Sequence, residues 1–234
     1  MEEKLQSAYI SEHFQVLQAL RDTPEKKVLK VRSKSSGKVY LLREFQGDPS
    51  VYERLLPLRS PYLPEIFEVI SDGDRVTVLE EFVAGDQMAE MLQGCLFTEK
   101  ETRKIGVDLC QALHVLHGLG IVHRDIKPEN IILRGDTAVL TDFDASRVSK
   151  TEQSRDTVAM GTVGFAAPEQ FSISQTDSRA DIYAMGVLLN TMMTDEHPST
   201  RLAKGKMGRI VTRCTMINPR KRYQSIGRLL EELL

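Results

Sequence analysis

The chain has 234 residues, 41% of them hydrophobic and 27% charged, which is the balance of an ordinary soluble globular protein and fits one domain or two lobes sharing a cleft. Its formal net charge of −2 gives no electrostatic case for a nucleic-acid partner, and no apolar run approaches the ~20 residues that span a membrane. The cysteines (Cys95, Cys110, Cys214) are odd in number and far apart, which argues against a disulfide framework or a zinc site. Since the N-terminus also lacks the apolar stretch of a signal peptide, we expect a cytoplasmic protein.

The first third of the chain has the short apolar runs and turn residues typical of β-strands. A short helix is expected over residues 51–58, stopped near Pro57 and Pro61. Turn residues at 35–37 and 71–74 separate neighbouring runs. The expected strands, which predict a small antiparallel sheet, are residues 15–20, 27–31, 38–43, 66–70 and 75–82.

Beyond Gly85 the pattern becomes helical. Thr98 with Glu101 three residues later has the form of a capping box, and apolar residues at helical spacing follow as far as Leu116.

Later segments predict a hairpin over residues 131–140 and two more helices. The hairpin places Asp142 just beyond the end of a strand. Residues 182–193, which follow Asp181, are apolar on nearly every side and predict a buried helix, and residues 224–234 predict a short amphipathic helix. Strands first and helices second indicate an α+β fold of two lobes, with a cleft between them as the expected ligand site.

The segment from His123 to Asp144 contains the residue types that phosphoryl transfer requires. That reaction needs metal-held phosphates, a carboxylate that orients the incoming hydroxyl group, and positive charge near the transferring group. Asp125 is the candidate base and Lys127 the candidate cation. Asn130 and Asp142 offer the oxygen ligands that Mg²⁺ prefers.

This segment resembles the catalytic loop and the metal-binding segment of the protein-kinase family, written H-R-D-L-x-x-x-N and D-F-G. Here they read His-Arg-Asp-Ile-Lys-Pro-Glu-Asn over residues 123–130 and Asp-Phe-Asp over residues 142–144. The wording of residues 127–130 is similar to that of serine/threonine kinases.

Further segments extend the resemblance, and among them Glu169, Arg222 and Asp181 are structural in the family. Residues 161–169 resemble the peptide-binding segment ending in A-P-E, and Arg222 resembles the arginine that pairs with its glutamate, here Glu169. Asp181 resembles the acid that opens the central helix, and we expect His123 to be structural as well.

The resemblance implies a single kinase-like domain over residues 1–234, with an N-lobe (1–82) built on a reduced antiparallel sheet, a hinge (83–86) and a mainly helical C-lobe (87–234). The implied reaction is transfer of phosphate from ATP to serine or threonine hydroxyls of a protein substrate, with Mg²⁺ or Mn²⁺. The chain looks like a small bacterial member of the family. An activating partner or a second copy could complete the small N-lobe.

The implied site falls on seven residues. Asp125, Lys127 and Asn130 are expected to be catalytic, and Asn130 and Asp142 to hold the metal. The nucleotide is expected to contact Arg43, Glu81, Val83 and Asp142.

The sequence departs from the family in the N-terminal part. Residues 20–28, where the glycine-rich loop belongs, contain no glycine, and Arg43 stands where the family has lysine. Glu53 or Glu44 are the candidate partners of Arg43, while Glu80 is expected to guard the back of the adenine pocket. These departures keep a pseudokinase, a binding or scaffold module without turnover, as the alternative, and a small-molecule kinase as a third class.

Two further interpretations stay open. Thr151, Ser154 and Thr157 are candidate phosphorylation sites that could pair with Arg124, against an unmodified solvated loop. The basic stretch from Arg201 to Arg213 is either a solvated face or a docking surface for an acidic partner.

Overall fold

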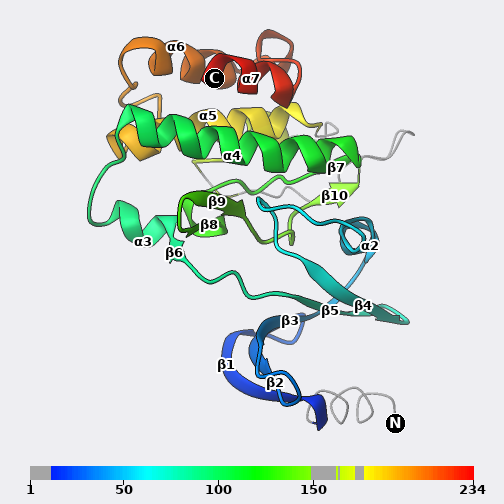
Figure 1. Ribbon diagram of the computed structural model, residues 1–234. Coiled ribbons are helices and arrows are strands. Elements are labelled where there is room, and N and C mark those ends of the chain that lie inside the picture. Colours follow the sequence, from blue (N-terminus) through cyan, green and yellow to red (C-terminus); the bar gives the residue numbers. More distant parts are fainter. Residues whose placement is uncertain (1–11, 149–161, 163, 172–176) are drawn as a thin grey trace. The chain divides into compact units, whose positions relative to one another are not determined.

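The computed structural model describes residues 12–148, 162, 164–171 and 177–234 (Figure 1). The candidate phosphorylation sites Thr151, Ser154 and Thr157 lie outside these residues. The chain divides into two compact units, residues 1–60 with 64–83, and residues 61–63 with 84–234. None of the helices in the described ranges has both the length and the apolar character that crossing a bilayer requires.

The first unit is a five-stranded antiparallel sheet with strand order β1-β2-β3-β5-β4. Its core contains Leu29 and Val31 of β2, which stand on either side of the less buried Lys30, and Leu42 of β3. The elements are β1 (Phe14–Asp22), β2 (Lys26–Ser33), β3 (Val39–Gln46), α2 (Ser50–Leu55), β4 (Ile66–Asp72) and β5 (Arg75–Glu81). All five predicted strands and the short helix are present.

The turn between β1 and β2 occupies the place of the missing glycine-rich loop. The N–H group of Thr23 donates to the carbonyl oxygen of Lys26 (2.9 Å), and the N–H of Lys26 donates to the carbonyl oxygen of Thr23 (3.2 Å). Between them stand Pro24, which has no N–H group, and Glu25. The turn is therefore closed on itself, and its backbone offers few donors to a phosphate group.

The second unit is mainly helical. Thr98 caps α4 through the predicted capping box with Glu101. The helices are α3 (Met88–Leu92), α4 (Glu99–Gly118), α5 (Arg179–Thr194), α6 (Gly205–Cys214) and α7 (Ile226–Leu233), with 3₁₀ turns η1 (Pro128–Asn130), η2 (Pro168–Phe171) and η3 (Pro219–Lys221). The short strands are β6 (Asp86–Gln87), β7 (Ile121–Val122), β8 (Ile131–Arg134), β9 (Thr137–Leu140) and β10 (Arg147–Val148). A sheet in one unit and helices in the other confirm the predicted α+β class.

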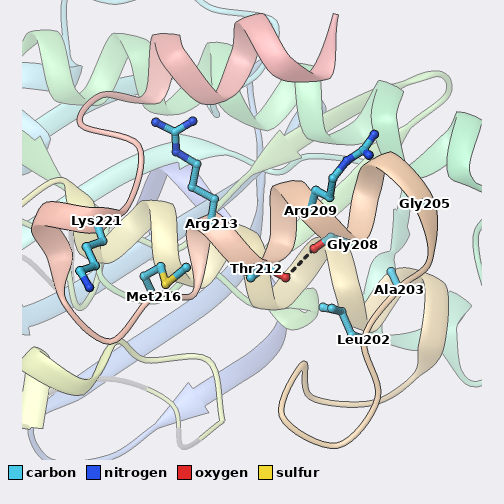
Figure 2. Close-up of a pocket in the computed structure, with 9 residues that line it drawn as sticks. All are labelled: Leu202, Ala203, Gly205, Gly208, Arg209, Thr212, Arg213, Met216 and Lys221. Carbon is cyan, nitrogen blue, oxygen red and sulfur yellow. Dashed lines mark hydrogen bonds between the residues drawn. The ribbon is translucent and has the colours of Figure 1, made fainter.

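Two helices of this unit, α3 and α6, had no counterpart in the sequence prediction. In α6 the buried positions include Met207, Ile210 and Val211, so the apolar spacing is helical. Glycines at 205 and 208 obscure that pattern, because glycine favours loops over helix interiors. Figure 2 shows this helix, with the Thr212 hydroxyl donating to the carbonyl oxygen of Gly208 at 2.8 Å.

Helix α5 forms the centre of the second unit, as its all-round apolar pattern predicted, and packs against α4 and α6 (Figure 1). Gly186 lets α5 approach α6, because a Cβ atom there would overlap the Cβ of Cys214. We expect Gly186→Ala to lower the free energy of unfolding by about 1–3 kcal/mol, the cost of overpacking a core.

The matched control is Gly227→Ala in α7, where the nearest atom to an added Cβ is 3.8 Å away. This change should be neutral or stabilise by up to about 1 kcal/mol, since alanine restricts the unfolded chain. Urea unfolding of both variants measures the difference. Equal stability of Gly186→Ala and the wild type would contradict the close approach of the two helices.

Candidate active site

The segments that carry the candidate catalytic residues are held between two short strand pairs of the second unit. β7 pairs with β10, and β8 pairs with β9. Residues 123–130 leave β7 and enter β8, while residues 141–146 leave β9 and enter β10. Both segments are therefore fixed at each end, although they are far apart in the sequence.

Asp125, Lys127 and Asn130 are in direct contact. The Nδ2 atom of Asn130 donates to the carbonyl oxygen of Asp125 at 2.8 Å and to its carboxylate Oδ2 at 3.0 Å. The Nζ atom of Lys127 lies 2.8 Å from the same Oδ2 atom. The carboxylate of Asp125 is thus held in one orientation by a cation and an amide.

Thr162 also contacts this carboxylate, and the sequence did not identify it as a site residue. Its hydroxyl group donates to Oδ1 of Asp125 at 2.7 Å and accepts from Nζ of Lys127 at 2.8 Å. Thr162 is distant from Asp125 in the sequence, and threonine has no distinctive spacing signal. Only its place in the stretch that resembles the peptide-binding segment pointed to this region.

The pKa of Asp125 reflects these contacts. Partial burial by itself raises the pKa, but hydrogen bonds from Lys127, Thr162 and Asn130 outweigh it, and the pKa lies below the usual value of an aspartate. Asp125 is therefore a carboxylate at neutral pH. A carboxylate held in this way is suited to orient a hydroxyl group and to receive its proton as the proton is released.

Asp142 follows Thr141, which is hydrogen-bonded to Asn130. The carbonyl oxygen of Asn130 accepts from the backbone N–H of Thr141 (2.8 Å) and from its hydroxyl group (3.1 Å), which ties the metal-binding candidates together. Asp142 has φ of 65°, a left-handed conformation that costs energy for residues other than glycine. The described residues contain no group of three His, Cys, Asp or Glu side chains placed to hold a metal. One carboxylate and one amide fit Mg²⁺, which commonly takes its other ligands from phosphates and water.

Asp181, at the start of α5, anchors the other end of the catalytic loop. Its carboxylate accepts from the backbone N–H of His123 (2.9 Å) and of Arg124 (2.8 Å), and it is 2.8 Å from Nε2 of His117. Arg124 has φ of 70°, and the two hydrogen bonds hold the backbone in this unusual conformation. His123 is buried, its ring lies edge-on to Phe143, and burial lowers the pKa of its imidazole. These contacts agree with a structural role for Asp181 and His123.

The ionisation of Asp181 should link stability to pH. Burial alone raises its pKa, but the hydrogen bond from His117 and nearby charges outweigh this effect, so the pKa is lowered. The stabilisation is then present above the unfolded pKa of about 3.9 and is lost as pH falls through the lower, folded value. In urea unfolding, Asp181→Asn should lower the free energy of unfolding by about 2–3 kcal/mol at pH 7. The free energy of unfolding of this variant should also fall less than that of the wild type as the pH is lowered.

Asp72→Asn, at an exposed strand end, is the control and should leave both the stability and its pH profile close to the wild type. An Asp181→Asn protein that is as stable as the wild type at pH 7 would contradict the anchoring role.

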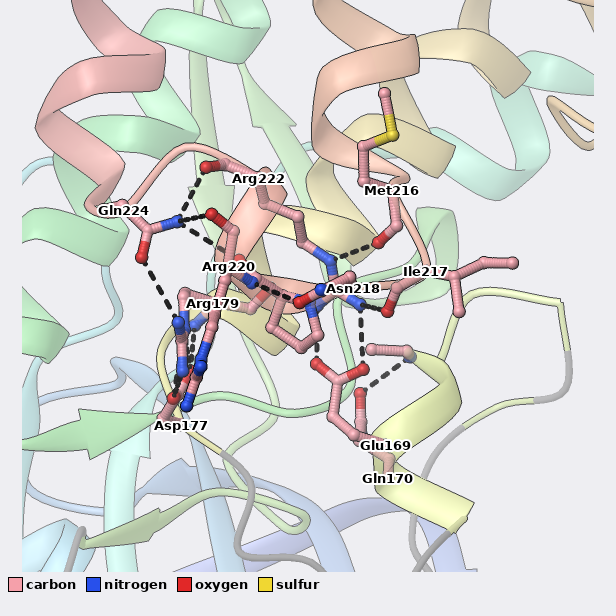
Figure 3. Close-up of polar contacts among 12 residues, drawn as sticks. Glu169, Gln170, Asp177, Arg179, Met216, Ile217, Asn218, Arg220, Arg222 and Gln224 are labelled. Atoms are coloured by element: carbon pink, nitrogen blue, oxygen red, sulfur yellow. Dashed lines mark hydrogen bonds and ion pairs between the residues drawn. The ribbon is translucent and has the colours of Figure 1, made fainter.

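Glu169 and Arg222 form the pair that the sequence predicted, and Figure 3 shows its surroundings. Nη1 and Nη2 of Arg222 lie 2.5 and 2.8 Å from the two carboxylate oxygens of Glu169. The Arg222 side chain is fully buried and also donates to the carbonyl oxygens of Met216, Ile217 and Arg179. The pair ties η2 to the C-terminal part of the chain.

Gln170, next to Glu169, connects the same segment to the catalytic loop. Its Nε2 atom donates to the carbonyl oxygen of Arg124 (2.9 Å), and its Oε1 atom accepts from the backbone N–H of Ala167 (3.0 Å). The segment over residues 164–171 and the loop that carries Asp125 are therefore joined by hydrogen bonds.

Arg43 lies in the first unit, and the structure pairs it with a residue other than those the sequence proposed. Its Nε atom is 2.6 Å from Oε1 of Glu80, and both side chains are buried, at 7% and 3% exposure. Arg43 is on β3 and Glu80 on β5, two adjacent strands. Glu53, one of the two acids considered from the sequence, is exposed on α2.

Glu81 and Val83 follow Glu80 in the first unit. The backbone N–H of Glu81 donates to the carbonyl oxygen of Glu65 at 2.8 Å. The carboxylate of Glu81 accepts from the backbone N–H of Glu65 at 3.2 Å. Val83 is buried, and its backbone forms no hydrogen bond with the described residues of its own unit. Arg43, Glu81 and Val83 thus belong to one unit, while Asp125, Lys127, Asn130 and Asp142 belong to the other.

Comparison with known families agrees with this geometry. The model of the protein kinase domain matches residues 15–232, which is nearly the whole chain. The chain therefore belongs to the protein kinase family, and the predicted resemblance is confirmed.

Individual relatives are similar at 28% identity. The serine/threonine-protein kinase AtPK2/AtPK19 of Arabidopsis thaliana matches over 95% of this chain and 50% of its own length. Ribosomal protein S6 kinase alpha-2 of Mus musculus matches over 76% of this chain and 28% of its own length. A protein of Clostridium acetobutylicum named as a probable serine/threonine-protein kinase matches over 72% of this chain and 30% of its own length. The chain spans half or less of the length of each of these relatives.

Proposed function

We propose that this chain is an ATP-dependent protein serine/threonine kinase, formed by one domain with a hinge at residues 83–86. The observation that carries the proposal is the carboxylate of Asp125, held by Lys127, Thr162 and Asn130 at hydrogen-bond distances. A fold that retained only its shape would not require a carboxylate in this constrained and ionised state. The family and the names of the relatives support the same reaction class.

In the proposed reaction the oxygen of a substrate serine or threonine attacks the γ-phosphorus of ATP, and the bond from that phosphorus to the β-γ bridging oxygen breaks, so that ADP leaves. Asp125 orients the attacking hydroxyl and receives its proton. Lys127 supplies positive charge beside the transferring group, and Thr162 keeps the carboxylate and the ammonium group aligned.

Asn130 and Asp142 are the residues that would hold Mg²⁺ or Mn²⁺. When bound, the metal neutralises charge on the phosphates. The chain's own contribution is positional, because the hydrogen bonds from Thr141 to Asn130 keep the two ligand-bearing segments in register.

The first unit would supply the nucleotide contacts. The backbone of Val83 has hydrogen-bonding groups not used within its own unit, which suits the edge of an adenine ring. Glu81 would contribute its carbonyl oxygen, since its N–H already donates to Glu65. Arg43 would face the phosphates, oriented by Glu80.

A pseudokinase is the second candidate, and two observations favour it. The closed turn between β1 and β2 offers few backbone donors to phosphate, and Arg43 is already paired with a buried acid. A partner protein or a second copy that contributes to the nucleotide site would reconcile these features with turnover. A cytoplasmic location, a bacterial origin and a protein substrate complete the proposal.

The test is phosphate incorporation from γ-labelled ATP into a generic basic protein, with Mg²⁺ or Mn²⁺, alongside nucleotide binding followed by thermal shift. Transfer supports the kinase. Nucleotide binding without phosphate transfer supports the pseudokinase, provided that transfer is also absent when two copies of the chain are crosslinked. Neither binding nor transfer overturns the enzyme proposal for this chain.

A further inference from the structure

The charge of this chain is distributed unevenly. Between Glu196 and Glu231 there is no aspartate or glutamate, although the whole chain has 33 of them. The rest of the chain has a formal charge of −11, since the total is −2 and this interval contributes +9. The nine cations are Arg201, Lys204, Lys206, Arg209, Arg213, Arg220, Lys221, Arg222 and Arg228.

Most of these cations have no acid beside them. Arg201, Arg222 and Arg228 pair with Glu196, Glu169 and Glu231. The other six form no ion pair with any residue in the part of the chain that the structure describes, although the guanidinium of Arg213 lies 4.4 Å from the ring centre of Tyr223. Their mutual repulsion is unfavourable by itself, and an anionic partner would relieve it.

Three of the unpaired cations border a pocket of about 500 Å³ beside α6, and Figure 2 shows it. Leu202 and Met216, which are 44% and 38% exposed, supply apolar surface near Thr212. The side chains of Arg209 and Arg213 extend upward from α6 in this view and border the pocket, and Lys221 lies beyond Met216. The lining thus combines apolar side chains with three cations.

The pocket is built by buried contacts and does not depend on exposed side chains alone. Gly208 lies so close to Ala203 that a Cβ atom would overlap the Ala203 carbonyl oxygen. Asn190, which is buried in α5, accepts from the N–H of Ala203 and donates to the carbonyl oxygen of Arg201, both at 2.8 Å. These contacts fix the segment before α6, so the pocket is formed before any partner binds.

We propose that this pocket is a docking site for an acidic peptide segment of a partner protein, with an apolar side chain in the pocket and carboxylates facing Arg209 and Lys221. A concave site with apolar walls fits a protruding side chain, which a flat bilayer surface does not present. A nucleic acid is disfavoured because the remainder of the chain is strongly acidic and repels a polyanion over its length. The lining of this pocket includes none of the proposed catalytic residues, and binding of the peptide does not require phosphate transfer.

The probe is a fluorescein-labelled peptide with one leucine flanked by glutamates, and the measurement is fluorescence anisotropy with the full chain. Two matched peptides carry glutamine for each glutamate, or serine for the leucine. We expect both to bind at least about tenfold more weakly, and binding of the acidic peptide to weaken as salt rises to about 0.5 M.

Arg209→Glu with Lys221→Glu should weaken binding of the acidic peptide at least about tenfold, and Met216→Ser should weaken it while leaving its salt dependence unchanged. Arg228→Glu is the control, since its side chain is 70% exposed on α7, outside the pocket lining, and it should bind as the wild type does. Arg209→Gln with Lys221→Gln replaces the reversed pair if thermal melting shows that the latter is unfolded.

The proposal is overturned if the peptide fails to bind at low salt, if the glutamine peptide binds equally well, or if the charge variants bind like the wild type. Tighter binding of single-stranded DNA or of phosphatidylserine vesicles, lost in the same variants, would also overturn it, by assigning the surface to a nucleic acid or a membrane.

Discussion

Asp125→Asn is expected to lower phosphate transfer by about 100- to 10,000-fold, the range that a positioned general base contributes. Asparagine keeps the shape of the side chain, and its oxygen can still accept a hydrogen bond from Lys127 or Thr162. It cannot receive the proton of the incoming hydroxyl group, and its neutral amide no longer balances the charge of Lys127. Initial rates at saturating ATP measure the loss.

Nucleotide binding should change little in this variant, because the lost interaction acts on the hydroxyl group of the substrate. Glu129→Gln is the matched control: Glu129 belongs to the same loop but is exposed, and it should keep the wild-type rate. Undiminished transfer by Asp125→Asn would mean that another carboxylate is the base, and the assignment of this site would be wrong.

Glu169→Ala is expected to lower the free energy of unfolding by about 3–5 kcal/mol, the cost of leaving a buried charge without its partner. Arg222 has no solvent-exposed side-chain surface, and both of its terminal nitrogens donate to Glu169. Its remaining acceptors are backbone carbonyl oxygens, which carry only partial charge. Urea unfolding followed by circular dichroism measures the change.

Glu231→Ala removes the acid of a surface pair with Arg228, in which the side chains are 63% and 70% exposed, and should cost no more than about 1 kcal/mol. The double variant Glu169→Ala with Arg222→Leu should lose less than the sum of the two single changes, since neither charge is then left alone. A loss below 1 kcal/mol in Glu169→Ala would show that the pair does not stabilise the chain.

The sequence by itself determined the features that depend on local pattern. Alternating runs predicted the strands of the first unit, and Thr98 with Glu101 predicted the start of α4, because a strand period and a helix cap each involve residues only a few positions apart. The catalytic loop was recognisable for the same reason, since Asp125, Lys127 and Asn130 lie within six residues of one another. Helix α6 was missed because its glycines interrupt the local signal.

Only the tertiary structure decided which distant side chains meet. The sequence offered Glu53 or Glu44 for Arg43, but the pairing of β3 with β5 brings Glu80 to it. Packing and hydrogen bonds between two distant segments bring Thr162 to Asp125, and no sequence spacing predicts this contact. The basic stretch was visible as composition, but its pocket depends on the close approach at Gly208. Contacts between residues far apart in the sequence are set by the packing of whole elements, and this information is absent from any local pattern.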